Sequence, residues 1–197
     1  MSEKKKKIVI ITAVVLAVIL LLFSIFHKKP EAVFTCAVVN GFLNDSEKKL
    51  STDLTEYFGL DNKKEYAYID KAYQIAYDGC DNKIADYSNY DKFFLNIRYQ
   101  MLDAAIVPES FAEYLYNLGE ILVDPTEIMS DAYSQKYGEY EVYYKNHCIG
   151  LDVTESGFLN GQDFMATQCN EDETYVLIFI SGSKGSEKRL RFIDYLF

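Results

Sequence analysis

The chain has 197 residues, of which 49% are hydrophobic, enough to build the core of one ordinary domain. Beyond the first 29 residues, which hold six lysines and a single acid, the sequence carries 14 basic and 29 acidic side chains. A surface this acidic repels phosphate backbones, which excludes nucleic acid as an expected partner.

The N-terminal residues predict a membrane anchor. The run Ile8 to Phe26 is apolar apart from Thr12 and Ser24, and as a helix it would cover roughly 28 Å, close to the thickness of a bilayer core. A cleaved signal peptide is the alternative, but it needs small residues at its cleavage site, and this run ends in Ile-Phe-His-Lys-Lys. A lipoprotein signal would place a cysteine directly after the run, whereas the first cysteine is Cys36.

The charges that flank this run predict its orientation. Four lysines, Lys4 to Lys7, precede it and two, Lys28 and Lys29, follow it, which favours a cytoplasmic N-terminus. We therefore expect residues 1–29 to form a cytoplasmic end and a single transmembrane helix. Residues 30–197 are then an extracytoplasmic domain held at the cell membrane.

The domain opens with a pattern typical of a βα unit. "AVFTCAVVNGF", Ala32 to Phe42, is a continuous apolar run that Asn-Gly interrupts near its end, which predicts a strand buried on both faces. The next segment carries Leu50 and Leu54 at helical spacing. A capping box that begins at Asn44 and a stop at Gly59 are the expected helix ends.

Three further segments follow in chain order. The first half of Glu65 to Tyr77 alternates and is rich in tyrosine, so we expect a strand near Glu65 to Ile69. Residues 78–90 have the composition of a loop. Residues 91–101 predict a helix with an apolar face made of Phe94, Ile97 and Met101.

The stretch "LDAAIVPESFAEYLYNLGEILVD" predicts another βα unit. Ala104 to Val107 is a short buried strand, Pro108 stands at the start of a helix, and Gly119 ends that helix. Asp124, followed by proline, is the expected cap of the next helix.

The last third of the chain changes to strand-like runs. Two of them surround the turn Lys145-Asn146-His147, a third covers Thr174 to Ser181, and residues 186–197 form an amphipathic helix. Helices that alternate with strands predict an α/β fold, a three-layer lobe with one mainly parallel sheet and helices on both faces. We expect Ala32 to Val39, Glu65 to Ile69, Ala104 to Val107 and Thr174 to Ser181 to share that sheet.

The four cysteines have no metal-binding spacing. Cys36 lies in an apolar strand-like run, which favours a buried free thiol. Cys148 and Cys169 lie in polar neighbourhoods and are better disulfide candidates than Cys36, in a compartment where disulfides are allowed.

Catalytic constellations are missing from the sequence. His27 lies at the predicted membrane edge and His147 in the predicted turn, where a solvated side chain is favoured over a catalytic base. There is no nucleophile elbow, phosphate loop or metal-binding motif. We expect no enzyme, no cofactor and no metal. The 17 tyrosines could line a ligand cleft or pack half-buried with their hydroxyls in water.

The order of these motifs resembles one lobe of the type 2 periplasmic, or extracellular solute-binding, proteins. The resemblance rests on a buried strand ending in "NGF", on "LDAAIVPESFAEYLYNLGEILVD", on "YYKNHCIGLDV" as a returning strand and on "SEKRLRFIDYLF" as a last helix. In that family the third strand typically opens with an aspartate, here Asp103. The resemblance implies a non-catalytic, membrane-anchored, solute-binding-like domain that contacts a small ligand or a transporter.

This chain departs from the family because only Glu127 to Leu159 lies where a second lobe would be inserted, which is too short for one. The clamshell that buries a ligand between two lobes is therefore absent. An alternative function is a protein-interaction module of the cell envelope, in which the acidic, tyrosine-rich surface docks another protein and no small ligand exists.

Candidate ligand-binding residues follow from the strand order. In open parallel sheets ligands gather outside the carboxyl ends of the strands, with turn or cap chemistry as the alternative role for residues found there. The amides after Pro108 are expected to favour an anionic or carbonyl-bearing group, for which Glu109 could compete. The expected residues are Asn40, Gly41 and Phe42 after the first strand, Tyr73 and Gln74 after the second, and Glu109 and Ser110 after the third.

Overall fold

The computed structural model describes residues 12–18, 29–80, 82–119, 121–167, 173–183 and 185–197. Of the predicted membrane span Ile8 to Phe26, only residues 12–18 fall within these ranges, and they are helical. No helix within the described ranges is long and apolar enough to cross a membrane. The remainder of the predicted span lies outside the described residues.

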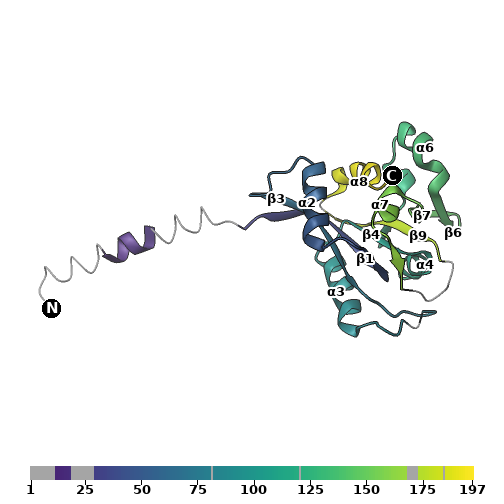
Figure 1. Ribbon diagram of the computed structural model, residues 1–197, viewed down its shortest axis with the longest axis horizontal. Coiled ribbons are helices and arrows are strands. Elements are labelled where there is room, and N and C mark those ends of the chain that lie inside the picture. The colour runs from purple at the N-terminus through teal and green to yellow at the C-terminus, as the bar shows by residue number, and fades with distance from the viewer. Residues whose placement is uncertain (1–11, 19–28, 81, 120, 168–172, 184) are drawn as a thin grey trace, which may run out of the picture.

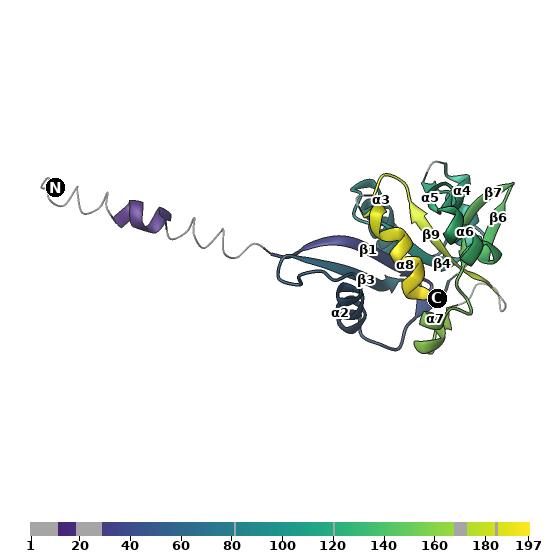
Figure 2. The same ribbon diagram turned by 90° about the horizontal axis from the view of Figure 1, so that it is seen from above.

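One seven-stranded sheet forms the centre of the domain (Figures 1 and 2). The strands follow the order β3-β1-β4-β9-β7-β6, and β5 also pairs with β9. A separate pair, β2 (Gly41–Phe42) and β8 (Met165–Ala166), forms a small second sheet. The strands of the main sheet are β1 (Glu31–Val39), β3 (Glu65–Tyr73), β4 (Ala104–Pro108), β5 (Leu122–Val123), β6 (Glu141–Tyr144), β7 (His147–Asp152) and β9 (Tyr175–Ile180).

The direction of the strands bears out the expected parallel sheet only in part. All four predicted strands belong to the main sheet, and β1 runs parallel to both β3 and β4. However, β9 runs antiparallel to β4, β5 and β7, so the sheet is mixed. The apolar run of β9 predicted its burial on both faces, which its residues do show, but burial on both faces does not fix the direction of a strand.

Helices cover both faces of the sheet, as predicted for a three-layer α/β fold (Figures 1 and 2). One apolar cluster joins the sheet to α2, α7 and α8, and a second joins its other face to α3 and α4. The helices are α2 (Glu47–Tyr57), α3 (Tyr87–Arg98), α4 (Glu109–Asn117), α5 (Pro125–Ile128), α6 (Asp131–Tyr137), α7 (Gly157–Gly161) and α8 (Arg189–Leu196), with 3-10 turns at Gly138–Tyr140 and Ser186–Lys188.

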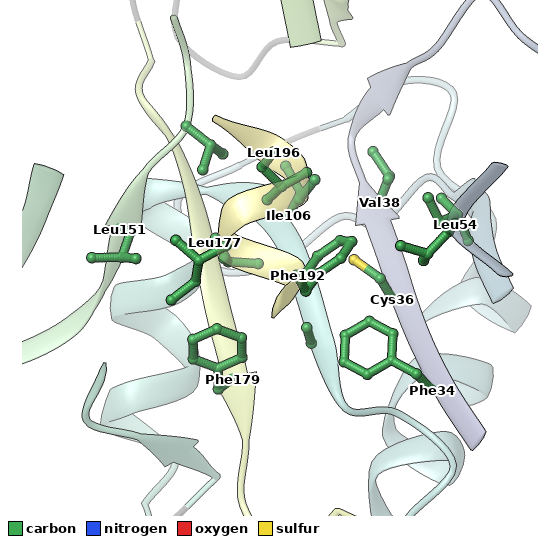
Figure 3. Packing of buried hydrophobic residues seen from close by; sticks show 14 of the residues in the cluster. Phe34, Cys36, Val38, Leu54, Ile106, Leu151, Leu177, Phe179, Phe192 and Leu196 are labelled. Carbon is green, nitrogen blue, oxygen red and sulfur yellow. The ribbon is translucent and has the colours of Figure 1, made fainter. Parts of the chain in front are cut away.

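The first cluster is the larger part of the core. Figure 3 shows alternate residues of β1 pointing toward α2 and α8, with β4, β7 and β9 beside them. The Phe34 and Phe192 rings lie 5.0 Å apart between their centroids and tie α8 to the first strand. Both side chains are fully buried, so this contact removes a large apolar area from water.

Helix α2 also protects an edge of the main sheet. β3 is the outermost strand on its side, and its outward backbone N–H groups would otherwise be open to another chain. The Ala67 amide donates to the Thr55 hydroxyl (3.0 Å) and the Ile69 amide to the Ser51 hydroxyl (3.1 Å). The polar residues of α2 that face the sheet therefore pair this part of the edge within the chain.

Several helix boundaries differ from the predicted ones. The N-cap of α2 is Ser46, whose hydroxyl accepts from the Lys49 amide, rather than Asn44. Gly59 does end that helix, with the positive φ of 67° that favours glycine. Gly119 ends α4 in the same way, and Asp124 caps α5 as predicted.

Helix α3 starts earlier than predicted and buries a different face. It begins at Tyr87, inside residues 78–90 that were expected to be loop. Phe93 is its fully buried residue, while Phe94 and Ile97 pack partly buried against the second cluster. Met101 lies beyond the helix and is 59% exposed, so its predicted place on the apolar face is wrong.

The cysteines follow the predictions only in part. Cys36 is a buried free thiol, as expected from its place in β1. Cys148 is also free and buried, in β7, so its prediction as a disulfide candidate is wrong. The disulfide-bonded cysteine among the described residues is Cys80, while Cys169 lies outside the described residues.

Asp103, the residue singled out by the family resemblance, has a structural role at the amino end of β4. One carboxylate oxygen accepts from the Thr35 amide (2.8 Å) and the other from the Gly185 amide (2.6 Å). A Cβ atom at residue 185 would overlap this carboxylate, which explains the glycine. The buried Arg189 guanidinium donates to the Ile180 carbonyl, and the Asp103 carboxylate favours its charged form. These buried side chains therefore cover this end of the sheet.

Asp194 of α8 fixes α6 to the domain. Its carboxylate accepts from the Tyr133 hydroxyl (2.5 Å), the Tyr137 hydroxyl (2.6 Å) and the Lys136 ammonium (2.9 Å). Burial alone would raise the pKa of Asp194, but these hydrogen bonds outweigh burial and hold the pKa below its ordinary value. The hydrogen bond between Tyr133 and Asp194 raises the pKa of Tyr133 to about 12.

Asp194 is expected to make stability pH-dependent in acid. Because its pKa is lower in the folded chain than in the unfolded chain, its contribution is present above the unfolded pKa of about 4 and is lost as the pH falls through the folded value. Urea midpoints of the wild type and Asp194→Asn, measured from pH 2 to 7, should differ most near neutrality and converge in acid. A constant difference across this range would contradict the assignment.

Candidate functional site

Asn40 lies at the carboxyl end of β1 and organises the predicted ligand edge. It is fully buried and adopts a φ of 51°. Its side-chain Nδ2 donates to the Ile75 carbonyl (2.9 Å). Its Oδ1 accepts from the Ile75 backbone N–H (2.8 Å) and from Asn82 Nδ2 (2.9 Å). Its carbonyl accepts from the Thr167 amide and the Tyr175 hydroxyl. Asn40 therefore joins the ends of β1 and β3 and has the buried, hydrogen-bonded role of a turn residue.

Gln74, directly after β3, joins the same network. Its Oε1 accepts from Asn82 Nδ2 (3.2 Å) and from the Thr167 hydroxyl (2.7 Å). Its carbonyl accepts from the Asp86 amide (3.2 Å). Gln74 and Asn40 are thus brought together as predicted, and their partners are groups of the chain itself.

Gly41 and Phe42 form β2, which pairs with β8. A Cβ atom at Gly41 would overlap the Phe164 ring, so a larger residue fits there only if that ring shifts. Phe42 is 43% exposed and lies opposite Met165, which is 64% exposed. Phe42 and Met165 therefore form a small apolar surface on β2 and β8, while Gly41 is buried.

Tyr73 is fully buried beneath α3 and cannot touch a ligand at the surface. Its hydroxyl accepts from Asn96 Nδ2 (2.7 Å), and its ring packs against Phe93 with a centroid distance of 5.6 Å. The Lys92 ammonium lies 4.5 Å from the ring centroid and pairs with Asp70. Tyr73 is a core residue that fastens α3 to the sheet.

Glu109 and Ser110 begin α4, where the helix has no side-chain cap of its own. The Glu109 amide donates to the Thr174 carbonyl (2.9 Å), and the Ser110 amide donates to the Glu173 carboxylate (2.9 Å). The Ser110 hydroxyl contacts the same carboxylate and also the Tyr77 hydroxyl (2.6 Å). A carbonyl and a carboxylate accept hydrogen bonds from these amides, and these are the two kinds of group expected there. Both belong to the segment of the chain before β9 and not to a ligand.

Glu173 is expected to stabilise α4 as a distant cap. Replacing it with alanine removes a charge-assisted bond at a helix N-terminus, with an expected loss of about 1 kcal/mol in the free energy of unfolding. Urea unfolding measures the loss, with the exposed Glu187→Ala as the control. Equal stability of Glu173→Ala and the wild type would contradict this role.

A pocket of about 350 Å³ lies beside this edge, between the connection that follows β3, the start of α3 and one side of α4. We call it the tyrosine pocket. Figures 1 and 2 show α3 and α4, the two helices that contribute to it. Its lining residues are Ala76, Asn82, Ala85, Asp86, Tyr87, Tyr90 and Tyr114.

The walls of the tyrosine pocket are held by aromatic packing. The Tyr114 ring stacks on Phe111 with a centroid distance of 5.8 Å, and the Tyr90 ring lies 4.6 Å from Phe94. The two tyrosine hydroxyls hydrogen-bond each other at 2.8 Å. Burial and that bond raise the pKa of Tyr90 to about 12, so its hydroxyl stays protonated near neutral pH. Tyr87 is 92% exposed and borders the pocket.

None of the tyrosine pocket's lining residues belongs to the predicted set. The start of α3 was expected to be loop, which hid the fact that Asp86 is an N-cap and that Tyr87 and Tyr90 share a helix. An aspartate ahead of an apolar run with helical spacing was the available signal. Tyr114 could not be found this way, because only the packing of α4 beside α3 brings it to the pocket.

The ranges described by the structure hold no group of three or more histidine, cysteine or acidic side chains that could bind a metal ion. Glu109 is the acidic group of the edge with a raised pKa, because it is partly buried and lies near Glu113, Asp152 and Glu173. No protein-family model, curated protein or solved structure matches this chain.

Proposed function

We propose that this protein is a membrane-anchored, extracytoplasmic, solute-binding-like domain that binds a small ligand without catalysis. The observation that carries the proposal is the tyrosine pocket, which lies beside the edge where β1, β3 and β4 end. Carboxyl ends of parallel strands are where ligands gather in open α/β sheets. A volume of about 350 Å³ is within the range of pockets that take small molecules.

The residues of the candidate edge support the proposal indirectly, because they hold the surroundings of the pocket in place. Asn40, Gln74 and Ser110 are satisfied by groups of the chain, so they support the pocket and its surroundings rather than offer free hydrogen bonds. The ligand contacts are then the exposed aromatic and acidic groups of the pocket. The likeness to a single lobe of type 2 solute-binding proteins, and contact with a transporter, are part of the same proposal.

A ligand screen tests this function. The purified full-length chain in a non-ionic detergent should show a raised melting temperature with at least one compound from a panel of amino acids, sugars, amines and short peptides. A variant with Tyr114 replaced by leucine should lose that response. No response to any class in the panel would contradict a small-molecule role.

The proposed topology gives a separate prediction. If Ile8 to Phe26 anchors the chain with the N-terminus in the cytoplasm, protease added to intact cells should digest the region from Pro30 to Phe197. A cytoplasmic protein in the same cells should survive, as the control for membrane integrity. Protection of the domain until the cells are lysed would show that the orientation is wrong.

An interaction module remains the second candidate, and a specific observation favours it. Phe42 and Met165 lie opposite each other on β2 and β8 with both side chains exposed, which forms a small apolar surface on the second sheet. A single stoichiometric partner in a crosslinking experiment, lost in Met165→Glu, would favour this function. Crosslinking that yields no partner, together with a ligand found in the screen, would favour the first.

A further inference from the structure

The polar groups of the tyrosine pocket decide which ligand chemistry it can take. Asn82 is the amide side chain in the lining, and its groups are already used. Its Nδ2 donates to Asn40 Oδ1 and Gln74 Oε1, and its Oδ1 accepts from the Ile84 amide (3.1 Å). Asn82 therefore has no free donor for a ligand, and the side-chain donors that remain in the described lining are tyrosine hydroxyls.

The aromatic lining offers ring faces as well as hydroxyls. Tyr90 and Tyr114 are held by their neighbours and by their mutual hydrogen bond, so little conformational entropy is lost when a ligand packs against them. Tyr87 adds a third ring at the border. The faces of aromatic rings carry negative electrostatic potential, which attracts a cation within about 6 Å of the ring centre.

Asp86 adds a full negative charge to the same pocket. One of its oxygens caps α3 by accepting from the Ser88 amide (2.8 Å). That bond lowers the pKa of Asp86, so the carboxylate is ionised near neutral pH. The seven lining residues that the structure describes include no lysine, arginine or histidine, and the domain as a whole is acidic.

We propose that the tyrosine pocket binds a small organic cation, an alkylated ammonium whose apolar substituents pack on Tyr87, Tyr90 and Tyr114 and whose charge faces Asp86. The inference rests on the proposed small-molecule function and names its ligand class. A free sugar would find no donor on Asn82, because its side-chain amide is already engaged. An anionic solute would meet the Asp86 carboxylate, and no cation among the described lining side chains would offset the repulsion.

The test uses two probes that differ in charge and hardly in shape. Choline and 3,3-dimethylbutan-1-ol, its uncharged carbon isostere, are titrated calorimetrically into the full-length chain in a non-ionic detergent. We expect choline to bind at least about 10-fold more tightly, since ring faces and a carboxylate both favour the charge. Added salt should weaken choline binding because the Asp86 interaction is screened.

Two variants have matched controls. Asp86→Asn keeps a good N-cap but removes the charge, and Asp124→Asn makes the same change at the cap of α5, away from the pocket. Tyr87→Ala removes an exposed ring of the pocket, and Tyr99→Ala removes an exposed ring outside it. We expect Asp86→Asn and Tyr87→Ala each to weaken choline binding about 3- to 10-fold, and both controls to leave binding unchanged.

The outcomes separate this inference from the function on which it rests. Equal affinity for the charged and neutral probes, or unchanged choline binding in both pocket variants, would overturn the cation assignment. Binding of a sugar, peptide or anionic amino acid in the pocket without choline binding would overturn it too, while the small-molecule function would stand. Failure of every compound class to bind would overturn both.

Discussion

Replacing Val38 with aspartate is expected to remove most of the domain's folding free energy. Val38 is fully buried in β1, opposite Ile106 of β4, and its side chain lies in the cluster between the sheet and α2 (Figure 3). A carboxylate there loses its hydration, and the described residues of the cluster offer it apolar side chains rather than a cation. We expect a cost of at least about 4 kcal/mol, against a total stability of about 5–15 kcal/mol for a typical domain.

Urea unfolding followed by far-UV circular dichroism measures this loss, with two variants as controls. Val38→Ala keeps the site apolar and should cost about 2 kcal/mol through the cavity it leaves. Phe42→Asp puts the same charge on a half-exposed position just beyond the strand and should cost less than about 1 kcal/mol. If Val38→Asp were as stable as the wild type, β1 would have to lie at a solvated edge.

Asn40→Ala is the substitution with the second largest expected effect. It leaves the Ile75 backbone N–H and carbonyl and one donor of Asn82 without their partner in a buried place. It also forces alanine into a φ of 51°, which is unfavourable for a residue with a Cβ atom. We expect the free energy of unfolding to fall by about 3 kcal/mol.

Asn40→Gly separates the two causes. Glycine adopts the positive φ easily but cannot replace the hydrogen bonds, so its loss should be smaller by roughly 1 kcal/mol. Equal losses in both variants would show that backbone strain contributes nothing. Because Asn40 supports the fold, a weaker ligand response in Asn40→Ala would not identify it as a ligand contact, whereas Tyr87 and Asp86 can be tested without that ambiguity.

The residues of the candidate edge could largely be predicted from the sequence, but their hydrogen-bond partners could not. The strand ends of β1, β3 and β4 were located from apolar runs, and Asn40, Gln74 and Ser110 do lie at those ends. Some of the groups that satisfy them belong to Thr167, Glu173 and Tyr175, more than 50 positions away from any of the three. A sequence pattern reports local spacing and does not report such distant pairing.

The sequence by itself determined the local features that depend on neighbouring residues. The apolar runs that became buried strands, the glycine stops at Gly59 and Gly119 and the cap at Asp124 are set by short-range sterics, hydrogen bonding and hydropathy. Only the tertiary structure decided the reversed direction of β9, the burial of Cys148 and the capping of α4 by Glu173. It also decided that Tyr114 of α4 and Tyr90 of α3 would meet in the lining of one pocket. That placement depends on how the two helices pack on the same face of the sheet.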